Sequence, residues 1–185
     1  MSLYRLLAQG NAVTTDSLAR SACVAPAEAE SILSGQPDVR RDSAGRIIGY
    51  GGLTVTKTKH RMQIGRNILY TWCAWDTLFI PRLLGITAQV ESSCPATGKP
   101  ISLTIHPGKI DPSGGRPPVS FVAPDRDKAA VNIVRDFCCH VQFFATKQAG
   151  NAWVSKHPGL RLATFGQAWK LGHRHIALRY PVART

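Results

Sequence analysis

The stretch that decides both the fold and the chemistry of this chain is residues 70–78, Tyr-Thr-Trp-Cys-Ala-Trp-Asp-Thr-Leu. Thr71 is a predicted helix N-cap, and the apolar run to Ile80 indicates a buried helix that contains Cys73 and Asp76. Side chains three residues apart share one face of a helix, so the thiol and the carboxyl are predicted to point into the same space. A cysteine in the first helical turn also lies at the positive end of the helix dipole, which favours the thiolate.

Length and composition are typical of a globular protein. The 185 residues are 44% hydrophobic, and no apolar run approaches the length of a membrane span. The first residues lack the pattern of a signal peptide, so we expect a cytoplasmic protein. Two of the five cysteines, Cys138 and Cys139, are adjacent, and neighbouring cysteines rarely pair because disulfide geometry is hard to meet there. The cysteines are therefore predicted to be reduced thiols used for metal binding, catalysis or core packing.

The net charge of +12 raises the question of a nucleic-acid partner. Residues 1–50 carry five basic and five acidic side chains, which cancel, and the rest of the chain carries 18 basic and 6 acidic ones. These basic residues are scattered singly, apart from an acid-free tail that begins at Arg161. The pattern favours a solvated basic surface over a dedicated nucleic-acid groove.

The N-terminal third predicts a winged helix-turn-helix fold. Short helices are expected at residues 3–9, from Thr14 or Thr15, and at 27–33, followed by two strands around a turn within residues 39–53. The helix at 27–33, where DNA would be read, has two acidic residues and no basic one, whereas phosphate and guanine recognition needs Arg or Lys. We interpret residues 1–55 as a packing domain.

Residues 56–185 predict a mixed α/β part with short antiparallel sheets, so the fold class is α+β. Residues 53–70 are expected to be strand-like, with further strands at 86–90, 101–105 and 119–122 and a central strand at 137–144; helices are expected at 128–135, 151–157 and 167–178. Residues 106–118 are rich in Pro and Gly and are expected to form a loop.

Several kinds of site could use the reactive residues, which are Cys73, Asp76, Cys94, Cys138, Cys139 and His140. A zinc site lacks support, because the chain has no Cys-x-x-Cys or Cys-x-x-His pair at ligand spacing, and adjacent cysteines on a strand face opposite ways. A cysteine hydrolase needs a Cys–His pair, but no motif selects one of the six histidines. Buried cysteines can also be plain core residues. Core packing explains Cys73 least well, because Asp76 should not lie in an apolar helix without a partner or a task.

Three stretches in the same order resemble the organomercurial lyase (alkylmercury lyase) family. They are residues 69–78 (LYTWCAWDTL), 94–104 (CPATGKPISLT) and 137–145 (FCCHVQFFA). Weaker similarity extends through residues 153–160 and 42–51, so the resemblance covers most of the chain.

The resemblance implies an enzyme that cleaves a carbon–mercury bond to a hydrocarbon and Hg(II), as part of mercury detoxification. It implies that Cys73, Cys138 and Asp76 are catalytic and also hold the mercury, that Cys94 is buried and structural, and that Cys139 is not essential. It implies a winged-helix-like part joined to a mixed α/β catalytic domain at residues 56–185. No organic cofactor is expected; external low-molecular-weight thiols, or a mercuric reductase, would take up the product.

The residue types suit that reaction. Mercury is a soft cation, and thiolates are its strongest protein ligands. A second thiolate adds electron density to the metal, which weakens the carbon–mercury bond and makes the carbon more basic. Asp76 could carry the proton that the carbon needs, and an apolar setting would favour its protonated form. Trp72, Trp75, Phe137 and Phe143 could provide that setting or could simply be core residues.

Two departures from the family pattern concern the ends of the chain. The chain begins later than typical members, so an N-terminal helix that helps to cover the site is expected to be shortened or absent. After Leu160 the sequence is shorter and more basic, and its match is poor. The alternative functions are a non-catalytic protein that binds Hg(II), Cu(II) or Zn(II) through thiolates, and a DNA-binding regulator. Asp76 separates the enzyme from the passive trap, which has no need of a proton carrier.

Overall fold

The winged-helix pattern predicted for the N-terminal third is present. The computed structural model describes residues 1–111, 115–123 and 132–180 of the chain. Its first elements are α1 (Ser2–Leu7), α2 (Thr15–Ala22), α3 (Pro26–Ser34), β1 (Val39–Arg41) and β2 (Ile47–Tyr50). The hydroxyl of Thr14 accepts the N–H of Ser17 at 3.1 Å and caps α2, as the sequence predicted.

A single antiparallel sheet joins this N-terminal part to the rest of the chain. Its further strands are β3 (Leu53–Thr54), β4 (His60–Ile64), β5 (Asn67–Thr71), β6 (Ala88–Ser93) and β7 (Pro100–Ile105). The strand order in the described residues is β1-β2-β3-β5-β4-β6-β7, and Tyr50 of β2 lies opposite Leu53 of β3. The sheet therefore runs without interruption from the wing of the N-terminal part to the strands that flank Cys73.

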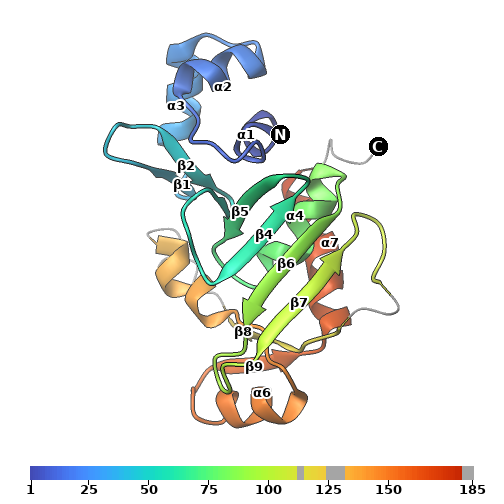
Figure 1. The fold of residues 1–185 in the computed structure, drawn as a ribbon. Coiled ribbons are helices and arrows are strands. Elements are labelled where there is room, and N and C mark those ends of the chain that lie inside the picture. Colours follow the sequence, from blue (N-terminus) through green and yellow to red (C-terminus); the bar gives the residue numbers. More distant parts are fainter. Residues whose placement is uncertain (112–114, 124–131, 181–185) are drawn as a thin grey trace.

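Two helices cover one face of the sheet (Figure 1). They are α4 (Asp76–Leu84) and α7 (Phe165–Arg179). They pack closely at Gly172, where a Cβ atom would lie 2.9 Å from the Cβ of Phe79. A second sheet of β8 (Val119–Val122) and β9 (Leu160–Ala163) lies with α6 (Lys147–Val154) at the other end of the molecule. None of the described helices is both long and apolar enough to cross a membrane.

The predicted helix around Cys73 begins later than expected. Helix α4 starts at Asp76, and its N-cap is Trp75, so the prediction of Thr71 as N-cap was wrong. The Thr71 hydroxyl instead donates to the Cys73 carbonyl at 2.8 Å. Cys73 thus lies in a tight turn between β5 and α4, and the shared orientation of Cys73 and Asp76 comes from this turn.

The predicted central strand at 137–144 was also wrong. Residues Cys138–His140 form a 3-10 helix, η1, followed by an extended segment in which Phe143 makes an isolated bridge to Val119. The aromatic and β-branched residues of this extended segment are buried, and Val141 and Phe143 are fully so. Their composition therefore indicated burial but not strand pairing. Of the helix expected at 128–135, residues 132–136 are helical and 128–131 lie outside the described residues, as do residues 112–114 of the expected loop.

Candidate active site

Three reactive side chains converge in the interior. The Sγ atoms of Cys73 and Cys138 and a carboxyl oxygen of Asp76 all lie within 4.8 Å of one another, and all three residues are buried. Cys73 comes from the turn after β5, Asp76 is the first residue of α4, and Cys138 is the first residue of η1. Of the six reactive residues singled out in the sequence, the fold brings these three together and leaves Cys94, Cys139 and His140 out of the cluster.

Backbone hydrogen bonds fix the first thiol against the carboxyl. The Cys73 N–H donates to Oδ2 of Asp76 at 2.9 Å, which closes the turn. The next residue, Ala74, donates its N–H to the Val141 carbonyl at 3.2 Å and accepts the Thr77 hydroxyl at 2.7 Å. The Ala74–Val141 bond ties the turn to the segment that follows η1, so the two cysteine-bearing segments are held together directly.

A glycine makes room for the carboxyl. Gly52 has φ +96°, and a Cβ atom there would lie between 2.5 and 2.9 Å from the carboxyl atoms of Asp76. Only glycine fits, both because L residues rarely adopt this φ and because the carboxyl occupies the space. The backbone carbonyl of Gly52 also accepts the N–H of Trp72 at 2.9 Å. The sequence analysis missed this contact. The consecutive glycines Gly51 and Gly52 before β3 were the feature of the sequence that could have indicated a close approach of the backbone there.

The second thiol is oriented by η1. Within this short helix Cys138 is buried and Cys139 is exposed, with the Cys139 thiol donating to the Arg135 carbonyl at 2.7 Å. The Ser120 hydroxyl of β8 donates to the His140 carbonyl at 2.7 Å and so fixes the helix from the other side. Although the predicted strand was wrong, the expectation that only one of the two adjacent cysteines faces the site holds.

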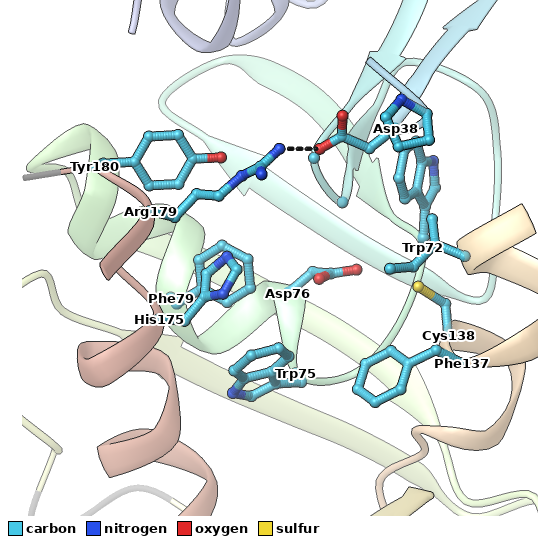
Figure 2. A pocket seen from close by; sticks show the side chains of 14 residues that line it. Asp38, Trp72, Trp75, Asp76, Phe79, Phe137, Cys138, His175, Arg179 and Tyr180 are labelled. Atoms are coloured by element: carbon cyan, nitrogen blue, oxygen red, sulfur yellow. Dashed lines mark hydrogen bonds and ion pairs between the residues drawn. The ribbon is translucent and has the colours of Figure 1, made fainter. Parts of the chain in front are cut away.

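A pocket of about 330 Å³ opens beside the cluster. Figure 2 shows the Cys138 sulfur and the Asp76 carboxyl turned into it, with aromatic rings along one side. Its lining comprises Pro37, Asp38, Gly51, Gly52, Trp72, Trp75, Asp76, Phe79, Ile133, Phe137, Cys138, His175, Arg179 and Tyr180. The Trp75 ring contacts Phe79 at 5.2 Å and Phe137 at 6.2 Å between centroids. Trp72, Trp75 and Phe137, which the sequence offered as pocket or core, line the pocket, whereas Phe143 is fully buried.

Burial dominates the electrostatics of the cluster. It raises the pKa of Asp76 to about 7, against the opposing effect of hydrogen bonds from the Cys73 thiol and N–H. Burial also raises the pKa of Cys73 well above its ordinary value, helped by its hydrogen bond with Cys138 and by the nearby Asp76 charge. Cys73 therefore rests as a neutral thiol, and the expectation of a thiolate favoured by the helix dipole was wrong because the residue lies before the helix and is fully desolvated.

The rim of the pocket comes from segments that sequence reasoning did not connect with the site. Arg179 at the end of α7 forms an ion pair with Asp38 at 3.3 Å, and His175 contacts the Trp75 ring at 5.2 Å between centroids. The guanidinium of Arg40 lies 5.4 Å above the ring of Trp72. No motif in the sequence pointed to these residues, because they meet the site only through the packing of α7, of β1 and of the loop before β1.

The sequence of this chain is similar to that of alkylmercury lyases along most of its length. The family model described as alkylmercury lyase matches residues 53–177, and the model for the helix-turn-helix domain of alkylmercury lyase matches residues 1–51. The chain is 40% identical over 176 residues to an alkylmercury lyase of Pseudomonas putida, covering 94% of this chain and 80% of the relative. An alkylmercury lyase of Streptomyces lividans is 40% identical, covering 92% of this chain and 78% of the relative.

Structural similarity agrees with the sequence matches. The solved mercury-bound form of MerB2 superposes with a TM-score of 0.74 at 26% identity, covering 89% of this chain and 82% of that one. Two buried thiols beside a carboxyl, on a scaffold shared with a mercury-bound protein, define a class of heavy-metal-handling thiol proteins. Within that class, the chain belongs to the alkylmercury lyase family. The family and the enzyme class that the sequence motifs indicated, a lyase that cleaves the carbon–mercury bond of organomercurials, are confirmed.

Proposed function

We propose that this chain cleaves the carbon–mercury bond by protonolysis, with Cys73 and Cys138 as the two mercury ligands and Asp76 as the proton carrier. The observation that carries the proposal is the convergence of two buried sulfurs and one carboxyl oxygen within 4.8 Å. A single mercury atom can bond to both sulfurs at this separation with little movement of the side chains, and the carboxyl then lies beside the metal.

Cys138 is the first ligand, because it lines the pocket whereas Cys73 is completely buried behind it. An organomercurial R–Hg–X exchanges X for the Cys138 sulfur, and the thiol proton leaves with X as HX. The product of this step is R–Hg–S-Cys138, with the carbon–mercury bond intact. The aromatic side of the pocket, centred on Trp75, then holds the organic group R away from water.

Proton transfer follows within the cluster. The Cys73 thiol passes its proton to ionised Asp76, whose pKa of about 7 makes it a competent acceptor near neutral pH. The new Cys73 thiolate bonds to mercury and makes the bound carbon more basic. Asp76 then protonates that carbon, so R–H departs and Hg(II) stays bound to both sulfurs. In sum, R–Hg–S-Cys138 and Cys73-SH give R–H and Hg(S-Cys)₂. Mercury stays in the +2 state throughout, so the reaction needs no oxidant or reductant.

The reaction as written needs no organic cofactor. Release of Hg(II) is proposed to require external low-molecular-weight thiols or a mercuric reductase, since two protein thiolates bind the soft ion tightly. All five cysteines are free thiols, and a thiol-dependent enzyme needs a reducing compartment, which supports the proposal of a cytoplasmic location. We retain residues 1–55 as a packing domain and 56–185 as the catalytic domain in this proposal.

The test is hydrocarbon release. The protein is incubated with methylmercury and excess 2-mercaptoethanol, and methane is measured in the headspace, with Cys138→Ser as the inactive partner. We expect methane from the wild type and none above background from the variant. A wild type that binds mercury but releases no methane would make the chain a passive metal trap, and full activity of Cys138→Ser would remove the proposed ligand pair.

A further inference from the structure

One ion pair at the pocket has no part in the proposed protonolysis. Arg179 donates from Nη2 to Oδ2 of Asp38 at 3.3 Å and to Oε1 of Gln36 at 3.4 Å. Figure 2 shows the Arg179–Asp38 pair on the side of the pocket opposite Trp75 and Phe137. The pocket therefore has an uncharged side with Trp75 and Phe137 and a side that carries the ion pair, and Cys138 is part of the same lining.

The guanidinium is held loosely. Its hydrogen bonds to Asp38 and Gln36 are at the long end of the hydrogen-bond range, and 46% of the Arg179 side chain is exposed; the side chain also hydrogen-bonds with Tyr180. A partly exposed pair of this geometry contributes little to stability. The contacts to Asp38 and Gln36 both leave from Nη2, whereas a guanidinium has five N–H donors. Arg179 can therefore engage a second acceptor without leaving its place at the pocket.

Arg179 also supplies positive charge to a pocket lining that includes the carboxyls of its ion-pair partner Asp38 and of Asp76. Among the described residues that line the pocket, the basic side chains are Arg179 and His175. Burial, together with the neighbouring Arg179, lowers the pKa of His175, so the imidazole is neutral at neutral pH. Arg179 is thus the positive charge of this lining, and it shares the pocket with Cys138.

In the proposed reaction the product Hg(II) leaves bonded to external thiols, and an organomercurial can enter with a thiolate as its group X. The pocket of about 330 Å³ is at the lower end of the range for ligand sites. A small thiol whose sulfur bonds mercury at Cys138 must place the rest of its molecule inside the same pocket. A carboxylate on that thiol would be poorly solvated against Trp75 and Phe137 unless it found a cation. A guanidinium accepts a carboxylate through two parallel hydrogen bonds.

We propose that Arg179 binds the carboxylate of the small thiol that exchanges with mercury at Cys138, so that the site prefers mercaptocarboxylates to neutral or cationic thiols. Asp38 holds the guanidinium over the pocket and gives way when the ligand carboxylate arrives. This inference rests on the proposed function. The exchange balances as Hg(S-Cys)₂ with two R′S–H giving Hg(SR′)₂ and two Cys-SH, with no oxidation or reduction.

The experiment varies the charge of the thiol. Steady-state methane release from methylmercury is measured with 3-mercaptopropionate, 2-mercaptoethanol or cysteamine, and rates are compared at equal thiolate concentration. We expect the wild type to turn over about three- to tenfold faster with the anionic thiol than with the neutral one, the range for a partly exposed charge-assisted contact. Arg179→Gln should lose most of this preference, and Arg179→Lys should keep part of it because the charge remains.

Two further variants separate a local contact from general attraction to a chain of net charge +12. Arg66→Gln removes the same charge at an exposed position in the turn between β4 and β5, outside the pocket lining, and should leave the preference unchanged. Asp38→Asn frees the guanidinium from its competitor and should increase the preference. Equal loss in Arg179→Gln and Arg66→Gln, or a decrease in Asp38→Asn, would overturn the inference.

Single-turnover measurements distinguish the two ways in which the thiol could act. Preformed complexes of methylmercury with each thiol report entry, and the chase with free thiol after one turnover reports exit; a preference in either step supports the carboxylate contact. Methane from the wild type without any charge preference would remove this inference and leave the proposed function standing. No methane with any thiol would instead remove the proposed function itself.

Discussion

Two buried cysteines of this chain occupy opposite environments. Cys94 lies in the turn between β6 and β7, where burial raises the pKa of its thiol. Hydrogen bonds from Thr97 and from the backbone N–H groups of Ala145 and Ala96 stabilise the thiolate more strongly, so the net effect is a lowered pKa. Cys73 has the reverse balance, and its pKa lies well above the ordinary value. Cys94 has the thiolate-stabilising surroundings usually associated with reactive cysteines, and yet it lies outside the cluster with Asp76.

The difference shows what the candidate active site provides. Burial raises the pKa of the Cys73 thiol well above its ordinary value, and the neighbouring Asp76 carboxyl has a pKa raised to about 7. A trap for mercury would benefit from preformed thiolates, whereas protonolysis needs a proton stored close to the carbon. The Cys73 environment supplies protons that mercury binding displaces, and the Cys94 environment does not.

The largest expected effect concerns which thiols are needed. Cys73→Ser and Cys138→Ser should each lower single-turnover hydrocarbon release by at least about 10³-fold, because one thiolate cannot activate the carbon–mercury bond and removal of a nucleophile abolishes its step. Cys94→Ser should keep release within about threefold while lowering the melting temperature, since Cys94 is buried and lies outside the cluster. Equal losses of hydrocarbon release at all three positions would contradict the proposal that Cys73 and Cys138, but not Cys94, take part in the reaction.

Removal of the proton carrier comes next. Asp76→Asn has nearly the same shape but cannot transfer a proton, so hydrocarbon release should fall by about 10²- to 10⁴-fold. Binding of Hg(II), followed by the ultraviolet absorbance of mercury–thiolate bonds, should persist because both sulfurs remain. An Asp76→Asn protein with unimpaired release would show that water or another group delivers the proton.

A smaller loss is expected from the glycine that accommodates the carboxyl. In Gly52→Ala the new Cβ would displace Asp76 by roughly 1 Å, which is worth about 10²-fold in rate. Gly65→Ala is a matched control, because Gly65 also has positive φ (+57°) but no atom within 4 Å of the added Cβ. If both variants lose the same activity, backbone strain and not the contact with Asp76 is the cause.

The last expected effect is on stability and not on the rate, and it follows from the Asp76 pKa. The folded value of about 7 exceeds the unfolded value of 3.8, so the folded state holds a proton that the unfolded state releases between these values. Stability should therefore fall as pH rises from about 4 to 7 and level off above, by up to about 4 kcal/mol in total. Buried His60, with its pKa lowered to about 3 by desolvation and by Lys59, acts in the opposite direction.

Because these two groups oppose each other, the informative quantity is the difference between Asp76→Asn and the wild type. Urea unfolding should show the variant gaining stability relative to the wild type from pH 4 to pH 7, reaching a plateau at higher pH. A difference that does not change with pH would mean that Asp76 titrates near its ordinary value in the folded protein.

Local patterns in the sequence predicted much of this molecule. Capping residues and apolar spacing located the helices and wing of the N-terminal third, and family motifs selected Cys73, Asp76 and Cys138, which the fold brings together. Burial was also predicted at Phe143, but the accompanying strand was not found, because composition reports burial without reporting hydrogen-bond partners. Gly52 was overlooked for a similar reason, since its role depends on a carboxyl that is distant in sequence.

The rim residues Asp38 and Arg179 could not be predicted at all. They are far apart in the chain and meet only when α7 packs against α4 and its last turn reaches the loop before β1. In a chain with many scattered basic residues, the local sequence around one charged residue does not indicate which distant residue it will pair with. The three residues of the cluster could thus be predicted from sequence motifs, whereas the charged residues at the rim of the pocket could be identified only from the tertiary structure.

The proposed ligand pair is tested most directly by a crystal structure of the wild-type protein after one turnover with an organomercurial in the absence of free thiol. We expect one mercury atom bonded to the sulfurs of both Cys73 and Cys138, with a carboxyl oxygen of Asp76 beside it. Mercury bonded to Cys138 and Cys139, or held at Cys94 with the cluster empty, would contradict this expectation.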